Sequence, residues 1–275
     1  MARDFDIAIL GATGSVGKVM AAYYAERAPA TLRWAICGRP KSEASLRKVH
    51  ADLMSTKPKS TPQQAFADVT DMASLRRIAA RSSVLLTSVG PYSSFGEAVV
   101  VACIEEGTHY VDITGEIWWV AEMRAKYGAR AQEMGVCLVS LAGYDCVPFE
   151  MSALLCHKHL KNSAGGSRLA SVECLTKVDG GGLPPGTMLT LLSVVTLGVG
   201  RALLGFARFL PRSERLGTLR DLGLWALPQW SYQHGGFTVL EGMGAVSCAP
   251  MHSTPPSSTP SRLPRERPTT ACIHS

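Results

Sequence analysis

Several kinds of residue and motif are scarce in this chain of 275 residues, and each scarcity narrows its function. Aromatic residues make up only 7%, which is too few for a stacking surface that binds single-stranded nucleic acid. Lys and Arg are spread along the sequence and leave a formal net charge of only +6, so a nucleic-acid partner is not favoured. None of the eight cysteines forms a C-x-x-C pair, which argues against a zinc ribbon or a thioredoxin-type site.

The N-terminus lacks the features of a secretory signal, because Asp4 and Asp6 occur early and no long apolar core follows them. A reducing, intracellular compartment is therefore the default expectation. Cys37, Cys103 and Cys137 lie within apolar runs, so we expect them to be small buried hydrophobic residues.

Charge is also scarce between residues 183 and 210, where Arg201 and Arg208 are the only charged side chains. A membrane-spanning helix needs about 20 consecutive apolar residues, and prolines and glycines interrupt this segment. We expect a buried helix or a wall of a substrate cavity. Contact with a membrane surface is the first alternative and a true membrane span the second.

What the sequence does contain, over its first 150 residues, is a regular alternation of strand-like and helix-like segments. The expected strands cover residues 6–10, 32–37, 65–69, 84–88, 109–113 and 136–141, and the expected helices cover 14–27, 42–53, 71–81, 95–106 and 118–134. This pattern predicts an α/β fold with a doubly wound parallel sheet of the Rossmann type, in the order 3-2-1-4-5-6. Thr70 or Asp71 should cap the third helix.

The alternation fades beyond about Phe149, where only a helix at 151–160 and a strand at 171–176 stand out. Thr187 can cap an apolar helix that runs to about Phe209. Six of the 16 prolines fall within residues 247–275, a segment rich in Ser, Thr and Arg. Such a composition cannot bury enough apolar surface to fold, so we expect this tail to be disordered.

A glycine-rich turn follows the first strand and opens the first helix, with the sequence Gly11-Ala12-Thr13-Gly14-Ser15-Val16-Gly17. Gly11 permits a tight turn, Gly14 leaves room for a pyrophosphate near the backbone, and Gly17 lets the helix pack closely. The helix N-terminus offers unpaired N–H groups and a positive dipole end to phosphates, and nearby hydroxyls can add donors. The Lys of a P-loop is missing, so ATP hydrolysis is not expected.

The end of the second strand indicates which dinucleotide binds. NAD-binding domains usually place Asp or Glu there, whereas an Arg accommodates the 2′-phosphate of NADP. Arg39 and Lys41 follow this strand, and no acid occurs before Glu43. We therefore predict NADP(H) as the cofactor, with Arg39 on the 2′-phosphate and Lys41 assisting. Asp68 follows the third strand, where the loop normally borders the adenine.

The next three strands end in further candidates, because ligands of doubly wound sheets gather at the carboxyl ends of the strands. A turn at Val89, Gly90 and Pro91 should border the nicotinamide. The catalytic candidates lining the same crevice are Tyr92, Asp112, Glu116 and Asp145. For Asp112 and Asp145 the alternative is a structural role, capping helices or fixing loops. His109 is expected to be structural, and no metal-ligand cluster or Tyr-x-x-x-Lys pair stands out.

Five blocks in this order resemble the saccharopine dehydrogenase-like oxidoreductases, a group that includes the trans-acting enoyl reductases of glycolipid synthesis. The blocks are Ile9–Gly17, Cys37-Gly38-Arg39, Val89–Tyr92 with Gly96-Glu97, His109–Glu116 and Gly143–Pro148. The resemblance covers about residues 5–160 well and 170–205 more loosely. It implies an NADP-binding Rossmann domain followed by an α+β substrate domain. For eukaryotic members it also implies association with lipid droplets, mitochondria or other membranes.

Members of that family usually continue for well over a hundred further residues, whereas the pattern here breaks after about Glu241. We therefore expect an NADP-binding domain at residues 1–150, a partial substrate domain at 151–246 and a disordered tail at 247–275. Such a C-terminal truncation would put the activity of the chain in doubt.

The leading hypothesis is an NADP(H)-dependent oxidoreductase that acts on a small-molecule, lipid-like substrate, because the stretch 180–200 carries no charge to bind the carboxylates of saccharopine. One alternative is a non-catalytic protein at a membrane or lipid-droplet surface that keeps the Rossmann fold. A weaker alternative is an epimerase or dehydratase with a tightly held nicotinamide.

Overall fold

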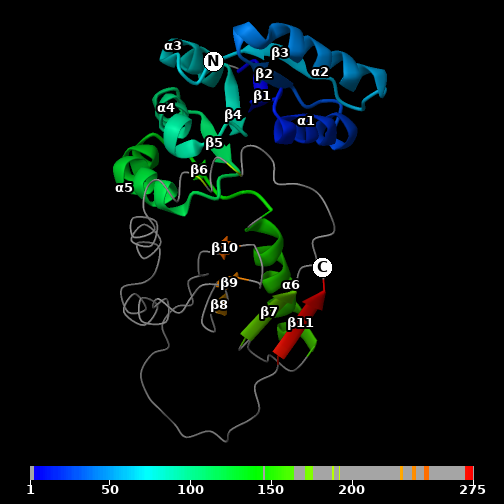
Figure 1. Cartoon of the computed structure of the whole chain (residues 1–275), viewed down its shortest axis with the longest axis vertical. Coiled ribbons are helices and arrows are strands. Elements are labelled where there is room, and N and C mark those ends of the chain that lie inside the picture. Colours follow the sequence, from blue (N-terminus) through cyan, green and yellow to red (C-terminus); the bar gives the residue numbers. More distant parts are fainter. Residues whose placement is uncertain are drawn as a thin grey trace, which may run out of the picture. The chain divides into compact units, whose positions relative to one another are not determined.

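The computed structural model describes residues 3–144 and 146–163, five later strands, and two helical residues, Met188 and Leu192. These residues fall into two compact units, of which the first includes residues 3–143 and the second begins at Tyr144 (Figure 1). Each unit is described by itself below. The first unit also takes in residues 182–206, and the expected domain bounds at residues 150 and 246 stay predictions.

The first unit alternates strands and helices in the predicted order (Figure 1). Its strands are β1 (Phe5–Leu10), β2 (Trp34–Gly38), β3 (Gln63–Phe66), β4 (Ser82–Thr87), β5 (His109–Asp112) and β6 (Leu138–Val139). Its helices are α1 (Ser15–Arg27), α2 (Glu43–Ser55), α3 (Met72–Ala80), α4 (Tyr92–Glu105) and α5 (Ile117–Glu133), with a 3₁₀ turn η1 (Pro40–Ser42) before α2.

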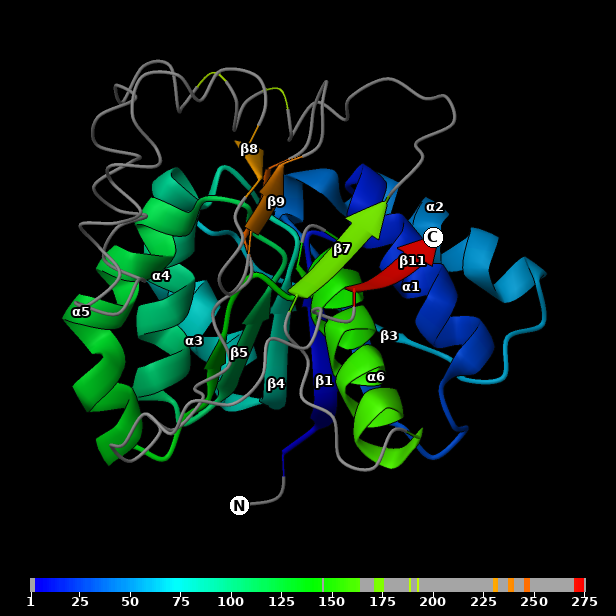
Figure 2. The ribbon, with the colours of Figure 1, turned by 90° about the horizontal axis from the view of Figure 1, so that it is seen from below.

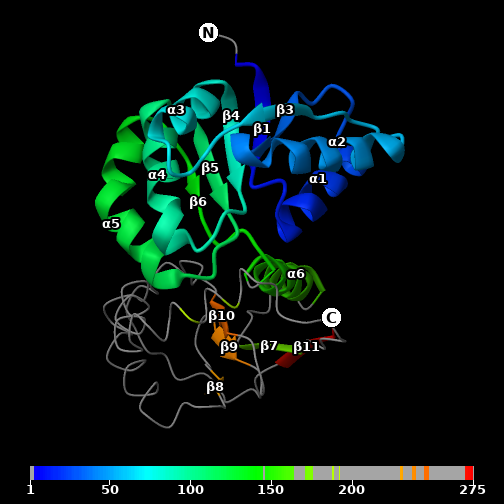
Figure 3. The same cartoon turned by 45° about the horizontal axis from the view of Figure 1, so that its top comes forward.

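The six strands form one parallel sheet in the order β3-β2-β1-β4-β5-β6, which confirms the predicted Rossmann topology. In the central register, Ile9 of β1 pairs with Ile36 of β2 on one side and with Leu86 of β4 on the other. Helices α1 and α2 cover one face of the sheet, and α3, α4 and α5 cover the other (Figures 2 and 3).

Strand alternation divides the core into two layers, one on each face of the sheet. Ile9 and Ile36 point to the face where Ala21 of α1 and Leu46 of α2 are buried. Ala8 and Leu10, the neighbours of Ile9 in β1, point to the opposite face of the sheet. That face has the larger apolar cluster, to which α3, α4 and α5 contribute. Because both faces are covered, the central strands are nearly continuous apolar runs.

Two of the three cysteines predicted to be buried are so, and the prediction for the third is wrong. Cys37 and Cys103 are fully buried, and burial raises the pKa of the Cys37 thiol to about 12. Cys137 is exposed. It precedes β6, a two-residue strand at the edge of the sheet, so its apolar neighbours in sequence do not place it in the core. His109, predicted to be structural, accepts a hydrogen bond at Nδ1 from the Cys137 N–H.

The second unit contains one described helix, α6 (Val147–Ser163), and two small sheets. Strands β8 (Trp230–Ser231), β9 (Phe237–Val239) and β10 (Ala245–Ser247) form an antiparallel sheet in the order β10-β9-β8. Strand β7 (Ser171–Leu175) pairs in parallel with β11 (Thr270–His274).

Strand β11 differs from the expectation of a disordered tail. The segment Thr270-Ala271-Cys272-Ile273-His274 contains no proline, although the tail as a whole is rich in proline, so it can join a ladder with β7. Most of the remaining tail and nearly all of the apolar segment 183–210 lie outside the described residues. Of that segment, Met188 and Leu192 are helical and about half exposed. No helix of the described part is long and apolar enough to cross a membrane.

At the amino edge of the sheet, the Arg3 guanidinium joins the segments that follow α3 and α4. Arg3 donates to five acceptors, namely the carbonyl oxygens of Ala79, Ser82, Glu106 and Gly107 and the hydroxyl of Thr108. Two of these carbonyls lie at the C-terminal ends of α3 and α4, where the helix dipole also favours a cation.

We predict that Arg3→Ala lowers the free energy of unfolding by about 2–4 kcal/mol, because five charged hydrogen bonds that join the ends of α3 and α4 are lost. Arg47→Ala, which removes an exposed ion pair with Glu43 at i,i+4, should cost less than about 0.5 kcal/mol. Urea unfolding of both variants tests the difference, and equal losses would contradict it.

Candidate cofactor-binding site

The glycine-rich turn after β1 has the geometry that a dinucleotide pyrophosphate requires. Gly11 has a φ of 89°, which favours glycine, and a Cβ there would lie 2.8 Å from Val89 Cγ2. A Cβ at Gly17 would lie 2.1 Å from the Gly11 carbonyl oxygen, so α1 can begin this close to the turn only with glycine. Gly14 is exposed, and a Cβ there would meet only the Gly11 oxygen, at 3.3 Å. The outer side of Gly14 is therefore open to a ligand.

Helix N-termini at this edge of the sheet differ in what satisfies their free N–H groups. The Asp71 side chain caps α3 by accepting from the Ala73 N–H, as predicted, and a buried carboxylate, Glu116, closes the first turn of α4. Helix α1 has Gly14 at its N-cap and no side-chain cap. Its first-turn N–H groups therefore lack helical partners, and Ser15 and Val16 of this turn are exposed.

Two exposed cations follow β2, where the sequence predicts NADP selection. Arg39 is the residue before η1 and Lys41 lies within it. Within residues 3–144 neither side chain has an ion-pair partner, so both charges are available to an anion. Both are close enough to Asp68 to help lower the pKa of its carboxyl, which places the ends of β2 and β3 beside each other.

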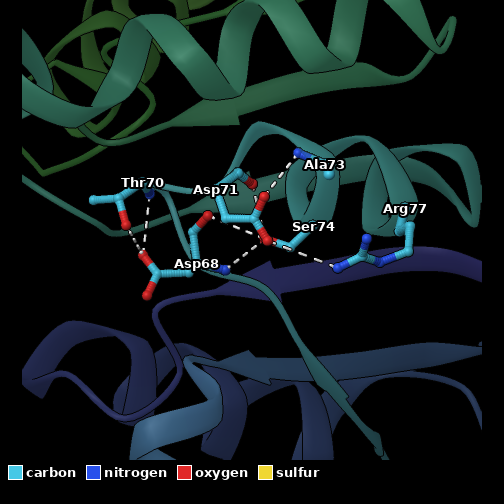
Figure 4. A network of polar contacts seen from close by, with 6 residues as sticks. All are labelled: Asp68, Thr70, Asp71, Ala73, Ser74 and Arg77. Atoms are coloured by element: carbon cyan, nitrogen blue, oxygen red, sulfur yellow. Dashed lines mark hydrogen bonds and ion pairs between the residues drawn. The ribbon is translucent and has the colours of Figure 1, made fainter.

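The loop after β3 is held by a polar network at the start of α3 (Figure 4). The Asp68 carboxylate accepts from both the N–H and the hydroxyl of Thr70, and these bonds are the main reason why its pKa is lowered. The Asp68 N–H donates to Ser74 Oγ at 2.9 Å. Asp71 also forms an ion pair with Arg77 at 3.8 Å (Figure 4). The loop predicted to border the adenine is thus fixed by its own side chains.

The turn after β4 packs directly on the glycine-rich turn after β1. Ser88 N–H donates to the Leu10 carbonyl at 3.0 Å, and Val89 makes the close approach to Gly11. The Gly90–Pro91 peptide is cis, and α4 begins at Tyr92. The predicted nicotinamide border therefore lies against the predicted pyrophosphate site.

Three of the four catalytic candidates are buried in the scaffold rather than exposed in a crevice. Tyr92 is 6% exposed, its hydroxyl donates to the Thr87 carbonyl, and burial raises its pKa. Asp112 is 0% exposed, and burial raises the pKa of its carboxyl against the opposing effect of several hydrogen bonds. Glu116 is 0% exposed and accepts from the N–H groups of Tyr92 and Ser93, at 2.7 and 2.9 Å.

Asp145, the fourth candidate, lies outside the described residues. Its neighbour Tyr144 is 62% exposed, with its ring edge against Phe149. Among the described residues, no group of three or more His, Cys, Asp or Glu side chains could hold a metal ion.

Several residues that shape this region were given no individual role from the sequence, although Gly96 and Thr114 lie in blocks of the family resemblance. Ser140 and Leu141 donate to the two Asp112 oxygens, and Thr114 accepts from the Glu116 N–H. Gly96 is needed because a Cβ there would lie 2.5 Å from the Trp119 ring. The role of Thr114 could have been predicted, because Asp-x-Thr often forms local hydrogen bonds between side chain and backbone. The other contacts join loops that are distant in the sequence.

Comparison with known proteins agrees with this geometry. Residues 7–139 match the family model described as the saccharopine dehydrogenase NADP-binding domain. This part of the chain belongs to that family. Its cofactor class is NADP(H), as the end of β2 predicts.

Several relatives are about one third identical to this chain over the aligned residues. A candidate trans-acting enoyl reductase of Mycobacterium tuberculosis is 34% identical over 195 residues, 70% of this chain and 45% of the relative. A lipid droplet localized protein of Caenorhabditis elegans is 33% identical, over 68% of this chain and 44% of the relative. A rat saccharopine dehydrogenase-like oxidoreductase is 32% identical, over 65% and 42%. The chain therefore spans less than half the length of these relatives.

Among solved structures, apo saccharopine dehydrogenase (L-Glu forming) of Saccharomyces cerevisiae is similar with a TM-score of 0.46 and 15% identity. The similarity covers 62% of this chain and 34% of that chain.

Gly14 provides a test of the phosphate site that spares the fold. We predict that Gly14→Val weakens NADPH binding by at least about tenfold because its side chain occupies the pyrophosphate approach. The free energy of unfolding should fall by only about 1 kcal/mol, because Val is a poorer N-cap residue than Gly. Gly128→Ala in α5, where a Cβ would meet only Arg124 Cγ at 3.9 Å, is the control and should keep full affinity. Fluorescence titration with NADPH decides, and undiminished affinity of Gly14→Val would refute the placement.

Proposed function

We propose that this protein is an NADP(H)-dependent oxidoreductase that reduces a lipid-like, unsaturated acceptor. The observation that carries the proposal is the edge of the sheet at β1 and β2. There the N-terminus of α1, which has no side-chain cap at Gly14, occurs together with Arg39 and Lys41, which have no ion-pair partner within residues 3–144. Membership in the NADP-binding family supports the cofactor, and the names of two relatives support lipid chemistry.

Each part of the dinucleotide has a proposed set of residues. The first-turn N–H groups of α1 and the backbone of residues 11–17 bind the pyrophosphate. Arg39 forks onto the 2′-phosphate, Lys41 adds charge, and Asp68 lies in the loop that borders the adenine. Val89, Gly90 and Pro91 form the border of the nicotinamide. NADPH, when bound, supplies a hydride to the acceptor.

The proton that completes the reduction does not come from Tyr92, Asp112 or Glu116 in this proposal. All three are buried, and each is engaged with backbone groups of the scaffold. Asp145 keeps its predicted place as a crevice candidate. The uncharged stretch 180–200 supports an apolar acceptor over saccharopine, whose carboxylates would need Arg or Lys partners.

The second candidate function is non-catalytic, namely an NADPH-binding protein at a lipid-droplet or other membrane surface. The scaffold roles of the three buried candidates and the name of the Caenorhabditis elegans relative favour it. A single experiment separates the two. The purified chain is mixed with NADPH and α,β-unsaturated acyl lipids, and NADPH oxidation and the reduced lipid are both measured. Oxidation coupled to lipid reduction supports the enzyme, binding without oxidation supports the alternative, and turnover of saccharopine alone contradicts the lipid assignment.

Arg39 tests the choice of cofactor. We predict that Arg39→Ala weakens NADPH binding by at least about tenfold and leaves NADH binding nearly unchanged, since only NADPH carries the phosphate that pairs with the guanidinium. Arg27→Ala, which removes an exposed cation at the end of α1, is the matched control and should bind both cofactors normally. Equal losses for NADPH and NADH would contradict the assignment of Arg39.

A further inference from the structure

A continuous line of buried hydrogen bonds joins the turns that follow β4, β5 and β6. Asp112 Oδ1 accepts from Thr114 N–H at 3.0 Å and from Leu141 N–H at 3.1 Å. Thr114 Oγ1 accepts from Glu116 N–H at 3.0 Å. Glu116 then accepts from Tyr92 and Ser93, the first two residues of α4.

We propose that Asp112, Thr114 and Glu116 form a brace that sets the position of the turn Val89-Gly90-Pro91, and that all three are positioning residues rather than proton donors. The nicotinamide role of that turn rests on the proposed function, whereas the brace itself does not.

The burial of the brace supports a rigid, scaffold role. Asp112 and Glu116 are 0% exposed and Thr114 is 3% exposed. Buried carboxylates are costly unless hydrogen bonds satisfy them, and here backbone N–H groups and the Ser140 hydroxyl do so. With both of its carboxylate oxygens engaged by α4, Glu116 cannot approach a substrate without releasing the first turn of that helix.

The backbone is strained at Leu141, where Asp112 of the brace meets the turn after β6. Leu141 has a φ of 62°, a left-handed conformation that is rare for a bulky residue. Such a conformation persists only when surrounding contacts enforce it. Asp112 supplies two of them, because its carboxylate accepts from Leu141 N–H and its carbonyl accepts from Ala142 N–H at 2.9 Å.

The end of the brace at Glu116 is connected, through the start of α4, to the glycine-rich turn after β1. Glu116 fixes the start of α4, and the preceding Val89 packs against Gly11. The Val89 N–H also donates to Thr87 Oγ1 at 3.2 Å, which ties the turn to the end of β4. A displacement of α4 would therefore move Val89 away from the pyrophosphate site.

Thr114 tests whether the contacts act as one unit, because its hydrogen bonds within the described residues join Asp112 and Glu116 and none goes directly to α4. Thr114→Val keeps the shape but removes the acceptor for Glu116 N–H. It should speed amide exchange at Tyr92 and Ser93 by at least about tenfold. Thr114→Ser keeps the hydroxyl and should restore near-normal exchange at these two amides. Glu97→Gln, which alters a different α4 carboxylate bonded to Tyr127, is the control and should leave them unchanged.

Asp112 distinguishes positioning from proton donation. In Asp112→Asn the amide oxygen can still accept from Thr114 and Leu141, and the amide nitrogen can donate to Ser140. We expect this variant to keep amide protection, NADPH affinity within about threefold and, where turnover is measured, kcat within about tenfold of the parent. Asp112→Ala should lose protection at both Leu141 and Tyr92 and weaken NADPH binding by at least about tenfold.

Two results would overturn the brace. One is Thr114→Val with normal exchange at Tyr92 and Ser93, which would make the contacts independent. The other is Asp112→Asn with full protection but without turnover, which would make Asp112 a proton donor. If the unmodified chain binds no NADPH, the proposed function fails, yet the exchange measurements still decide the brace because they need no cofactor.

Discussion

The approach of Gly17 to the Gly11 carbonyl is the constraint on which the cofactor edge depends. It allows α1 to begin directly behind β1, so that the uncapped first turn of the helix faces the carboxyl end of the sheet. Any side chain at Gly17 would push the helix away from the turn and move its N–H groups with it. The positions of Val89 and of the end of β2 follow, because both turns pack on or bond to the same loop.

The helix N-termini at the carboxyl edge of the sheet differ in whether a carboxylate of the protein binds their free N–H groups. At α3 and α4 carboxylates of the protein occupy the first turns, and at α1 none does. Since a helix N-terminus attracts one anion, a side chain already bound there excludes a phosphate. Asp71 and Glu116 therefore leave the first turns of α3 and α4 unavailable to a phosphate, whereas the first turn of α1 has no such carboxylate.

Much of the fold and part of the site could be predicted from the sequence. Strand order follows from the alternation of apolar runs, and the roles of Gly11 and Gly17 follow from the motif. The capping role of Asp71 could be predicted because a capping side chain binds a backbone N–H only two residues further along the chain. The partners of Glu116 were not readable, since they lie in a different loop and meet it only after β4 and β5 pair. The exposure of Cys137 likewise depends on the position of its strand at the edge of the sheet, and the pairing of β11 depends on a distant strand.

The close packing of Gly96 on Trp119 gives this region an optical property. The indole is 3% exposed, its Nε1 has no hydrogen-bond partner in the described part of the chain, and its ring lies 5.8 Å from that of Tyr92. Its backbone N–H bonds to the Glu116 carbonyl. Trp119 should therefore emit as an apolar, solvent-shielded indole that accepts excitation energy from Tyr92. The chain has five tryptophans, so the part of its emission that is lost in a Trp119→Phe variant reports on the packing of α4 against α5 without any added label.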